Sequence, residues 1–452
     1  MTLLEPSVSF VLNRKGIISM KVSKFGGTSL ADANQIKKVI NIVLSDSDRQ
    51  YVVVSAPGKR NPDDRKITDL FYDWHQLSNS QSSSEEIQSA IRERYSRIID
   101  GLGISFNLEV EMADIAQKIG FGGSSDYAAS RGEYLNGKII AKALGYQFVD
   151  PISCIFFDNN GRYHEADEKL QEILRGQKAV IPGFYGSMPN GSVKTFARGG
   201  SDITGAIVAR AMGASLYENW TDVSGLLMAD PRVVENPRKI DVVTYRELRE
   251  LSYMGASVFH EEAMFPVQEA GIATNIRNTN VPTDPGTTIV VEGVQQKEGF
   301  VIVGVAGRKN FTVITVEKMM LNQQVGFMRR ILSILETNGI SFEHMPGGID
   351  TVSIIIDDKQ LEGKLDKVLH EIKEECSPDN LVAFPNMAMI AAVGRAMINT
   401  PGVSAKVFTA IAEAGINVRM INQGSSEISI FVGVENEDYE ATARAVYGAF
   451  VK

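Results

Sequence analysis

The chain has 452 residues, of which 44% are hydrophobic and 22% are charged, and its formal net charge is −9. At about 150 residues per domain, this length predicts roughly three domains. The acidic balance disfavours nucleic acid as a partner, since proteins that bind phosphate backbones usually carry a basic excess. No apolar run reaches the about 18 residues of a membrane span. The two cysteines, Cys154 and Cys376, are too few for a disulfide scaffold and fit a reducing cytosol, so the composition favours a large acidic cytosolic enzyme.

The first nineteen residues do not match a secretory signal. The short apolar stretch 7–12 is followed by Arg14 and Lys15, whereas a signal places its charge before the apolar core and a small-residue cleavage site after it. We expect either an ill-ordered extension or a start assigned too early, with Met20 as the true initiator.

Short β-rich runs alternate with helix-like stretches up to about residue 280. The runs end in Gly, Ser or Pro or in a polar turn, and they cover 20–25, 51–54, 179–181 and, more weakly, 215–218. The helix-like stretches include 32–44, 84–99, 134–144 and 202–212. This alternation predicts an α/β layered fold with a mainly parallel sheet. Ligands bind beyond the carboxyl ends of the strands in such sheets, so the Gly/Ser tips are expected to lie at the site.

The segment 24–29 reads Lys-Phe-Gly-Gly-Thr-Ser and joins the first strand to the first helix. Two glycines let a backbone approach phosphate oxygens, and Lys24 supplies a positive point charge beside them. The plainer interpretation is a strand-to-helix turn with a surface lysine. The hydroxyls of Thr28 and Ser29 favour the phosphate interpretation.

The segment 198–202 reads Arg-Gly-Gly-Ser-Asp and precedes the fourth helix-like stretch. Ser201 is a candidate N-cap. The helix dipole there favours an anion by ~0.3–1 kcal/mol, and Arg198 can bind a carboxylate or phosphate through two nitrogens. Asp202 could complement the dipole, or it could position a lysine or a metal. A third element, 221–223 with 230–232, could hold a nucleotide through polar contacts. By itself it is a weak signal, since a Thr-Asp turn is common.

Other templates do not fit. Residues 132–138 spell G-x-x-x-x-G-K, but Ile139 stands where a P-loop needs Ser or Thr. No G-x-G-x-x-G follows a strand, which argues against a dinucleotide site. The five histidines and two cysteines show no metal-ligand spacing.

Beyond a turn-rich and polar region at 282–299, the chain repeats itself. Six residues recur at a constant offset of 76 without a gap. They are Gly326, Gly339, Ile340, Gly348, Ser353 and Ile354, which recur as Gly402, Gly415, Ile416, Gly424, Ser429 and Ile430. This indicates two copies of one small α+β unit.

From about Met20 to its C-terminus the sequence closely resembles the aspartokinase family. The resemblance rests on segments 24–29 and 198–202, on Trp220-Thr221-Asp222 with Asp230-Pro231-Arg232, and on a repeated unit similar to tandem ACT domains, with Ile-Asn-Gln-Gly-Ser at 421–425. It implies an amino-acid kinase (carbamate-kinase-like) α/β/α sandwich with a mainly parallel sheet, plus two ferredoxin-like α+β ACT domains. The implied boundaries are an extension at 1–19, a catalytic domain at 20–293 and ACT domains at 301–380 and 385–452, which could exchange strands.

The implied activity is MgATP-dependent phosphorylation of the β-carboxylate of L-aspartate, the first step toward lysine, threonine and methionine. By motif matching, Lys24 and Asp202 are the catalytic pair, the lysine stabilising phosphoryl charge and the aspartate organising it. The implied aspartate-binding residues are Ser55, Thr68, Glu133, Phe184, Arg198 and Ser201, with Glu133 on the amino group and Arg198 on the α-carboxylate. The implied ATP-binding residues are Lys24, Gly26, Gly27, Ser29, Thr221, Asp222, Leu227, Arg232, Ser257 and Val258.

Two positions depart from the family pattern. Many relatives have Lys where Ser257 stands and an aromatic residue where Leu227 stands, so adenine or phosphate contacts are expected to differ. Neither departure touches Lys24 or Asp202.

The ACT resemblance implies feedback inhibition by lysine, threonine or both, and pairing into a homodimer or homotetramer. The implied effector positions are Gly326, Phe327, Met328, His344, Met345 and Asp350. The plainer interpretation is that the ACT units only dimerise. We expect a cytoplasmic enzyme that uses ATP and Mg²⁺, with neither nucleic acid nor membrane as a partner. The alternatives are another amino-acid or acyl kinase of the same fold and a catalytically inactive amino-acid sensor.

Overall fold

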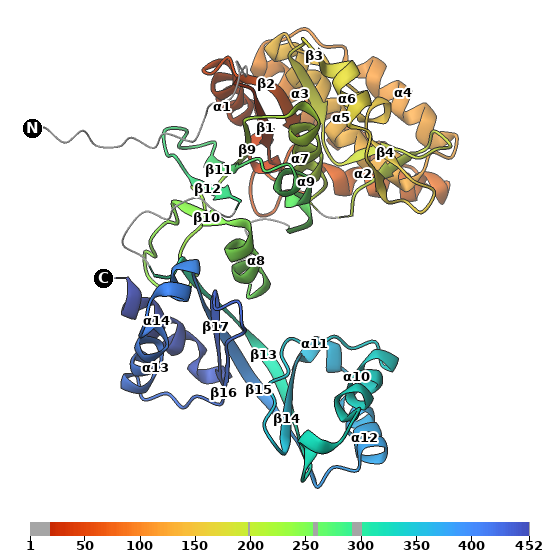
Figure 1. The fold of residues 1–452 in the computed structure, drawn as a ribbon. Helices are drawn as coiled ribbons and strands as arrows, with labels where there is room; N and C mark the ends of the chain where they lie inside the picture. Colours follow the sequence, from red (N-terminus) through yellow and green to blue (C-terminus); the bar gives the residue numbers. More distant parts are fainter. Residues whose placement is uncertain (1–18, 198, 256–260, 292–300, 452) are drawn as a thin grey trace, which may run out of the picture. The chain divides into compact units, whose positions relative to one another are not determined.

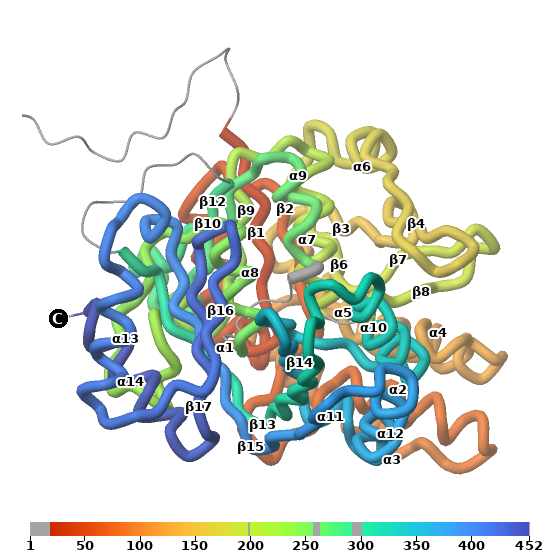
Figure 2. The backbone as a smooth tube through the Cα atoms, turned by 60° about the horizontal axis from the view of Figure 1, so that its bottom comes forward, coloured from red at the N-terminus to blue at the C-terminus, as the bar shows by residue number. Residues whose placement is uncertain are grey.

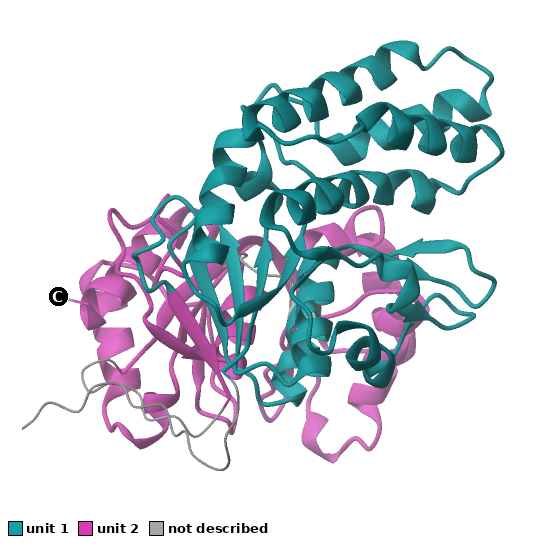
Figure 3. Ribbon diagram, turned by 90° about the horizontal axis from the view of Figure 1, so that it is seen from above, with its two compact units in different colours: residues 1–224, 262–286 teal, residues 225–261, 287–452 magenta. Residues whose placement is uncertain are grey.

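The computed structural model describes residues 19–197, 199–255, 261–291 and 301–451 (Figure 1). The chain divides into two compact units, residues 1–224 with 262–286 and residues 225–261 with 287–452 (Figure 3). The domain boundaries drawn from the sequence stay predictions, but compactness groups residues 225–261 with the C-terminal part of the chain. No helix in the described ranges combines the length and the apolar character that a membrane crossing requires.

The first unit is built on a parallel sheet, which confirms the predicted fold class. Its strands, in sheet order, are β11 (Thr274–Asn278), β9 (Leu216–Thr221), β1 (Lys21–Phe25), β2 (Arg49–Val54), β6 (Ala179–Pro182) and β3 (Gln147–Phe148). Each neighbouring pair is parallel. The central strands are buried on both faces, which explains their nearly continuous apolar runs. Figure 2 shows β1 running between β2 and β9.

Helices cover both faces of this sheet. One face and its core cluster are covered by α1 (Ala33–Leu44), α2 (Ile67–Asn79), α3 (Glu85–Leu102), α4 (Leu108–Gly120) and α5 (Ser125–Leu144). On the other face α7 (Gly200–Met212) packs on β1, β2 and β9, with α6 (Asp167–Leu174) and α9 (Phe265–Glu269) against it. This arrangement is the expected three-layer sandwich.

Smaller elements complete the first unit. A four-stranded sheet has the order β5 (Tyr163–His164), β4 (Phe156–Phe157), β7 (Tyr185–Ser187) and β8 (Val193–Thr195). The 3₁₀ turns are η1 (Gly27–Leu30), η2 (Pro151–Ser153) and η3 (Glu261–Met264). The turn η1 directly follows β1 and lies at the predicted phosphate-binding segment.

The second unit begins with the parallel pair β10 (Val242–Thr244) and β12 (Thr287–Val290) and with helix α8 (Tyr245–Tyr253). A capping box between Thr244 and Glu247 starts α8. A second sheet has the order β14 (Thr351–Asp357), β13 (Gly304–Glu317), β15 (Asn380–Val393), β17 (Ser429–Glu435) and β16 (Met420–Asn422). Its helices and turns are η4 (Leu321–Gln323), α10 (Phe327–Thr337), α11 (Asp358–Leu361), α12 (Leu365–Cys376), η5 (Arg395–Asn399), α13 (Val403–Glu413), η6 (Asn436–Asp438) and α14 (Tyr439–Phe450).

The internal repeat places two equivalent helices, α10 and α13, each of which begins after a glycine. Helices α10 and α13 begin 76 residues apart and have the same length. Their N-caps, Gly326 and Gly402, have φ values of 78° and 86°, a left-handed conformation that favours glycine. The recurring glycines therefore mark a backbone requirement of the repeated unit.

Two long strands run through both copies of this repeat. The first part of β13, 304–308, pairs with the last part of β15, 389–393, whereas 313–317 of β13 pairs with 380–384 of β15. The β15 half at 387–393 also pairs with β17, and the β13 half at 311–317 pairs with β14. The sheet of the second copy thus contains residues that precede the first copy in sequence.

Candidate active site

The predicted phosphate-binding segment forms a tight turn at the carboxyl end of β1. The Gly26 N–H donates to the Trp220 carbonyl oxygen at 3.0 Å, and the Gly58 N–H donates to the Gly27 carbonyl oxygen at 2.8 Å. A Cβ at Gly58 would lie 2.5 Å from the Gly27 carbonyl carbon, so no side chain fits there. A Cβ at Gly26 would lie 3.6 Å from Lys24 Nζ, and a longer side chain would cover the ammonium group. Gly26 therefore leaves the ammonium group of Lys24 uncovered, and Gly58 allows close contact with the backbone of Gly27.

Lys24 and Asp202, predicted from two separate segments, lie in contact. Lys24 Nζ is 2.5 Å from Asp202 Oδ1, and the two side chains are only 9% and 16% exposed. Asp202 lies in the first turn of α7, the helix that packs on β1, β2 and β9. A charge pair with little solvent around it has a stronger field than an exposed pair, because water screens it less.

The helix α7 begins two residues earlier than the sequence indicated. Its N-cap is Gly199, with φ 62°, so the expectation that Ser201 is the N-cap is wrong. Glycine adopts a left-handed φ readily, so the chain enters the helix at Gly199 without a capping side chain. Ser201 instead packs on Gly183, where a Cβ would lie 2.6 Å from Ser201 Oγ. Arg198 lies outside the described residues.

Phe184 lies next to Ser201 in a strained backbone conformation. Its φ is 83°, a value that few non-glycine residues adopt. The Phe184 N–H donates to Thr204 Oγ1 at 3.1 Å, and its carbonyl accepts from the Phe196 N–H at 2.9 Å, which holds the strained residue in place. Strain of this kind is common at ligand sites.

Glu133 is a buried carboxyl group on α5. Burial raises its pKa to about 7, although a backbone hydrogen bond from Ala56 opposes the shift. Its Oε2 is buried and has no hydrogen-bond partner in the described part of the chain. Ser55, which precedes Ala56, accepts from Asn136 Nδ2 through its carbonyl oxygen at 2.7 Å. Glu133 and Ser55 thus lie together at the carboxyl end of β2, and Thr68 lies in the first turn of α2.

The predicted nucleotide residues divide between the two units. In the first unit, Thr221 ends β9 and its hydroxyl donates to Asp222 Oδ1 at 3.1 Å. Ser29 is 2% exposed, and its hydroxyl lies 2.8 Å from that of Thr279. In the second unit, Leu227 is 39% exposed and Arg232 is paired with Asp230 at 2.6 Å. Ser257 and Val258 lie outside the described residues.

Behind the active-site face lies a buried charge network that the sequence patterns did not reveal. Glu218 accepts from Arg49 at 2.7 and 3.1 Å, from Ser23 Oγ at 2.8 Å and from Trp220 Nε1 at 3.1 Å. Arg277 Nη1 lies 3.6 Å from the same carboxylate. Burial alone would raise the pKa of Glu218, but the hydrogen bond and charge of Arg49 lower it below its ordinary value.

The structure also adds Asn219 to the predicted site. Its Nδ2 donates to Asp202 Oδ1 at 2.7 Å, and the residue is 3% exposed. Sequence reasoning missed it because the strand run 215–218 was expected to end before it. The sequence shows only that a polar pair, Glu218 and Asn219, stands between Tyr217 and Trp220, and its burial becomes visible only in the structure.

The predicted effector residues lie in the first ACT-like copy. Phe327 is 1% exposed and belongs to the core there, while the backbone N–H of Met320 donates to Asp350 Oδ1 at 2.7 Å. His344 Nδ1 lies 2.9 Å from Asn422 Nδ2, and its ring packs against Phe431 at 4.3 Å between centroids. His344 thus joins the two copies of the repeat.

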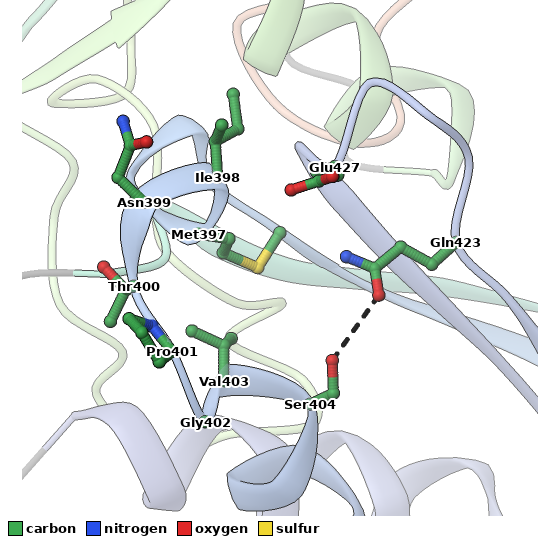
Figure 4. Close-up of a pocket in the computed structure, with 10 residues that line it drawn as sticks. All are labelled: Met397, Ile398, Asn399, Thr400, Pro401, Gly402, Val403, Ser404, Gln423 and Glu427. Carbon is green, nitrogen blue, oxygen red and sulfur yellow. Dashed lines mark hydrogen bonds between the residues drawn. The ribbon is translucent and has the colours of Figure 1, made fainter.

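A pocket of about 380 Å³ lies in the second copy (Figure 4). It is lined by Met397, Ile398, Asn399, Thr400, Pro401, Gly402, Val403, Ser404, Gln423 and Glu427. Two of these lining side chains are joined by a hydrogen bond, which Ser404 Oγ donates to Gln423 Oε1 at 3.4 Å. Residues 402–404 are the repeat counterparts of Gly326, Phe327 and Met328.

The class of protein follows from this fold and from two family matches. The model of the amino acid kinase family matches residues 19–278, and an ACT domain model matches residues 390–450. A helix-covered parallel sheet with a glycine turn and a buried Lys–Asp pair at its strand ends agrees with a kinase of that class.

Individual relatives narrow the class. Aspartokinase 3 of Bacillus subtilis is 38% identical over 449 residues, which are 95% of this chain and 98% of that protein. The crystal structure of Clostridium acetobutylicum aspartate kinase matches with a TM-score of 0.92 and 52% identity over 95% of this chain and 100% of that one. E. coli aspartokinase III in complex with aspartate and ADP matches with a TM-score of 0.70 and 26% identity over 96% and 100% of the two chains. The chain belongs to the aspartokinase family.

Proposed function

We propose that this chain transfers the γ-phosphoryl group of ATP to the β-carboxylate of L-aspartate, giving ADP and 4-phospho-L-aspartate. The observation that carries the proposal is the buried Lys24–Asp202 pair beside the glycine turn, in a chain of the aspartokinase family. The product is the first intermediate on the route to lysine, threonine and methionine.

Phosphoryl transfer needs positioning and charge neutralisation more than covalent chemistry. Lys24 supplies a positive charge with little competing water, and Asp202 fixes that charge in place. Because both substrates are anions and the protein is acidic overall, positive charge must be concentrated locally at the site.

Recognition of aspartate is assigned to the residues around Glu133. As a carboxylate, Glu133 would pair with the substrate ammonium group, which would satisfy its unpartnered Oε2. Arg198 would bind the α-carboxylate, with Phe184 and Ser201 beside it. Ser55 and Thr68 are the remaining residues that we assign to aspartate binding.

Binding of ATP is assigned to the turn at Gly26 and Gly27 and to the polar residues Thr221, Asp222 and Arg232. Mg²⁺ would arrive with the nucleotide and neutralise its phosphates. The described ranges contain no group of three or more His, Cys, Asp or Glu side chains suited to a metal ion, and Mg²⁺ bound with a nucleotide is usually held by one or two carboxylates together with the phosphates.

Regulation is assigned to the ACT domains, with lysine, threonine or both as feedback inhibitors. The E. coli relative has been crystallised with lysine and aspartate in a T state, which supports an amino-acid effector here. We further assign a homodimer or homotetramer formed through these domains, and a cytoplasmic location that agrees with two buried free cysteines.

The decisive experiment measures ATP consumption with L-aspartate or L-glutamate while hydroxylamine traps the acyl phosphate. We expect a hydroxamate with aspartate only. A hydroxamate with glutamate alone would favour a different amino-acid kinase, and none with either would favour an inactive sensor. If saturating lysine and threonine, singly and together, leave the rate unchanged, the regulatory assignment is wrong.

A further inference from the structure

Strands β1 and β9 present two matched sets of side chains to the two faces of the sheet. They pair in parallel, and Lys24 lies directly opposite Asn219. On one face Ser23 bonds to Glu218, and Phe25 stacks on Trp220 at 5.9 Å between ring centroids. Because side chains alternate along a strand, Lys24 and Asn219 share the opposite face, toward α7.

On that face Asp202 receives contacts from both strands. Its Oδ1 accepts from Asn219 Nδ2 at 2.7 Å and lies 2.5 Å from Lys24 Nζ. Its backbone carbonyl oxygen accepts from Tyr217 Oη at 3.1 Å, two residues before Asn219 on β9. One strand therefore holds both the main chain and the side chain of Asp202, while the neighbouring strand carries the lysine.

We propose that Asn219 is a positioning residue for phosphoryl transfer, acting on Lys24 through Asp202. The inference rests on the proposed function and deepens it. The amide of Asn219 fixes the orientation of the Asp202 carboxylate, so the carboxylate holds the Lys24 ammonium at one place. Asn219 is only 3% exposed, and the hydrogen bond that its amide donates goes to Asp202.

An amide is well suited to this position. It donates a hydrogen bond to a carboxylate without adding a second positive charge, so Lys24 remains the sole charged partner within the described contacts of Asp202. A carboxylate at 219 would repel Asp202, and an aliphatic side chain would leave Oδ1 with one donor fewer. Because a hydrogen bond to a charged group contributes more to stability than one between neutral groups, removing this one should affect the pair strongly.

The test compares Asn219→Leu, which keeps the volume but loses the donor, with Asn219→Asp, which replaces the donor with an acceptor. We expect kcat to fall about 10- to 100-fold in Asn219→Leu and at least as far in Asn219→Asp. The KM values for ATP and aspartate should stay within threefold, since Asn219 acts on the reacting charge and not on binding.

The matched control is Asn275→Leu. Asn275 is also a buried strand asparagine, and its Nδ2 donates to the Pro285 carbonyl oxygen at 3.0 Å. This variant should lose stability but keep kcat within twofold of wild type. A kcat within twofold in Asn219→Leu, or an equal loss in Asn275→Leu, would overturn the inference.

A second measurement does not depend on which substrate is phosphorylated. Asn219→Leu should lower the folding equilibrium constant about tenfold in the wild type but less than twofold in the Asp202→Ala background, because its partner is absent there. Equal effects in both backgrounds would overturn the inference. A wild type that forms no hydroxamate would refute the proposed function alone, since this double-mutant cycle still reports the Asn219–Asp202 interaction.

Discussion

The ammonium group of Lys24 contacts the carboxylate of Asp202 at 2.5 Å, although one residue belongs to the first strand and the other to a helix much later in the chain. The contact exists because parallel strands bring their carboxyl ends to one edge, where the N-terminus of α7 also begins. The charge that we assign to phosphoryl transfer is thus positioned by the fold and not by a local motif.

Replacing Lys24 with Met should reduce kcat by at least about 100-fold, because a preorganised charge on the transferring group is lost. The hydroxamate assay measures the rate. Lys21→Met is the matched control, since Lys21 lies on the same strand and pairs with Asp46 at 2.7 Å. A near-normal rate in Lys24→Met would contradict the assigned role even if the reaction is right.

Aspartate recognition should depend on pH through Glu133. Because burial raises the pKa of Glu133 to about 7, the carboxylate that we propose binds the substrate ammonium is lost as the pH falls below this value. The value of kcat/KM for aspartate should therefore drop about tenfold per pH unit below about 7. In Glu133→Gln it should be low throughout and lack this slope. A flat profile in the wild type would refute the assignment.

The same group affects stability in the opposite direction. The folded pKa of Glu133 lies above its ordinary value of 4.5, so its contribution to folding is complete below about pH 4.5 and is lost as the pH rises through about 7. In urea denaturation, the free energy of unfolding of the wild type should fall between pH 5 and pH 8 relative to that of Glu133→Gln.

The contact between Gly58 and Gly27 should be sensitive to a single methyl group. In Gly58→Ala the new Cβ would meet the Gly27 backbone at 2.5 Å, so the glycine turn must move and the KM for ATP should rise about tenfold or more. Gly120→Ala, at the end of α4, meets nothing within 4 Å and should leave KM unchanged. If the KM for ATP is the same in the two variants, the glycine turn tolerates displacement and the prediction is wrong.

Glu218→Gln should cost stability while leaving most activity. The change removes the charge that pairs with Arg49 and faces Arg277, and an uncompensated buried charge costs about 3–5 kcal/mol. Urea denaturation measures this loss, and kcat should stay within about threefold because Glu218 lies on the face away from Lys24. The pKa of Glu218 is lowered in the fold, so this stabilisation is present above pH 4.5 and is lost as the pH falls. A loss below about 1 kcal/mol would contradict the role of the network.

Much of the fold was predictable because apolar periodicity dominates it. The stretches 32–44 and 202–212 correspond closely to α1 and α7, and the 76-residue offset predicted two equivalent helices. The stretch 134–144 missed the first nine residues of α5, where buried Ser130, Arg131 and Glu133 hide the apolar pattern. A buried polar residue looks like a surface residue when only the sequence is read.

The site was predictable where backbone chemistry leaves a signature. The glycines beside Lys24 and Asp202 indicated tight turns, and the two segments do meet. Asn219, Tyr217 and Glu218 could not be found in the same way, because their roles depend on which strand lies beside β1. That neighbour is determined by tertiary packing and not by any local pattern.

The pairing of β13 with β15 determines the order in which this protein can assemble during synthesis. Gly304 leaves the ribosome about ninety residues before Val393, its partner in the sheet. At about 5–20 residues per second, the first half of β13 waits roughly 4–18 seconds as an open edge. The other half meets 380–384 sooner, so the first ACT-like copy closes before the second. An unpaired strand is a template for pairing with another chain, so slow translation should harm the C-terminal copy first.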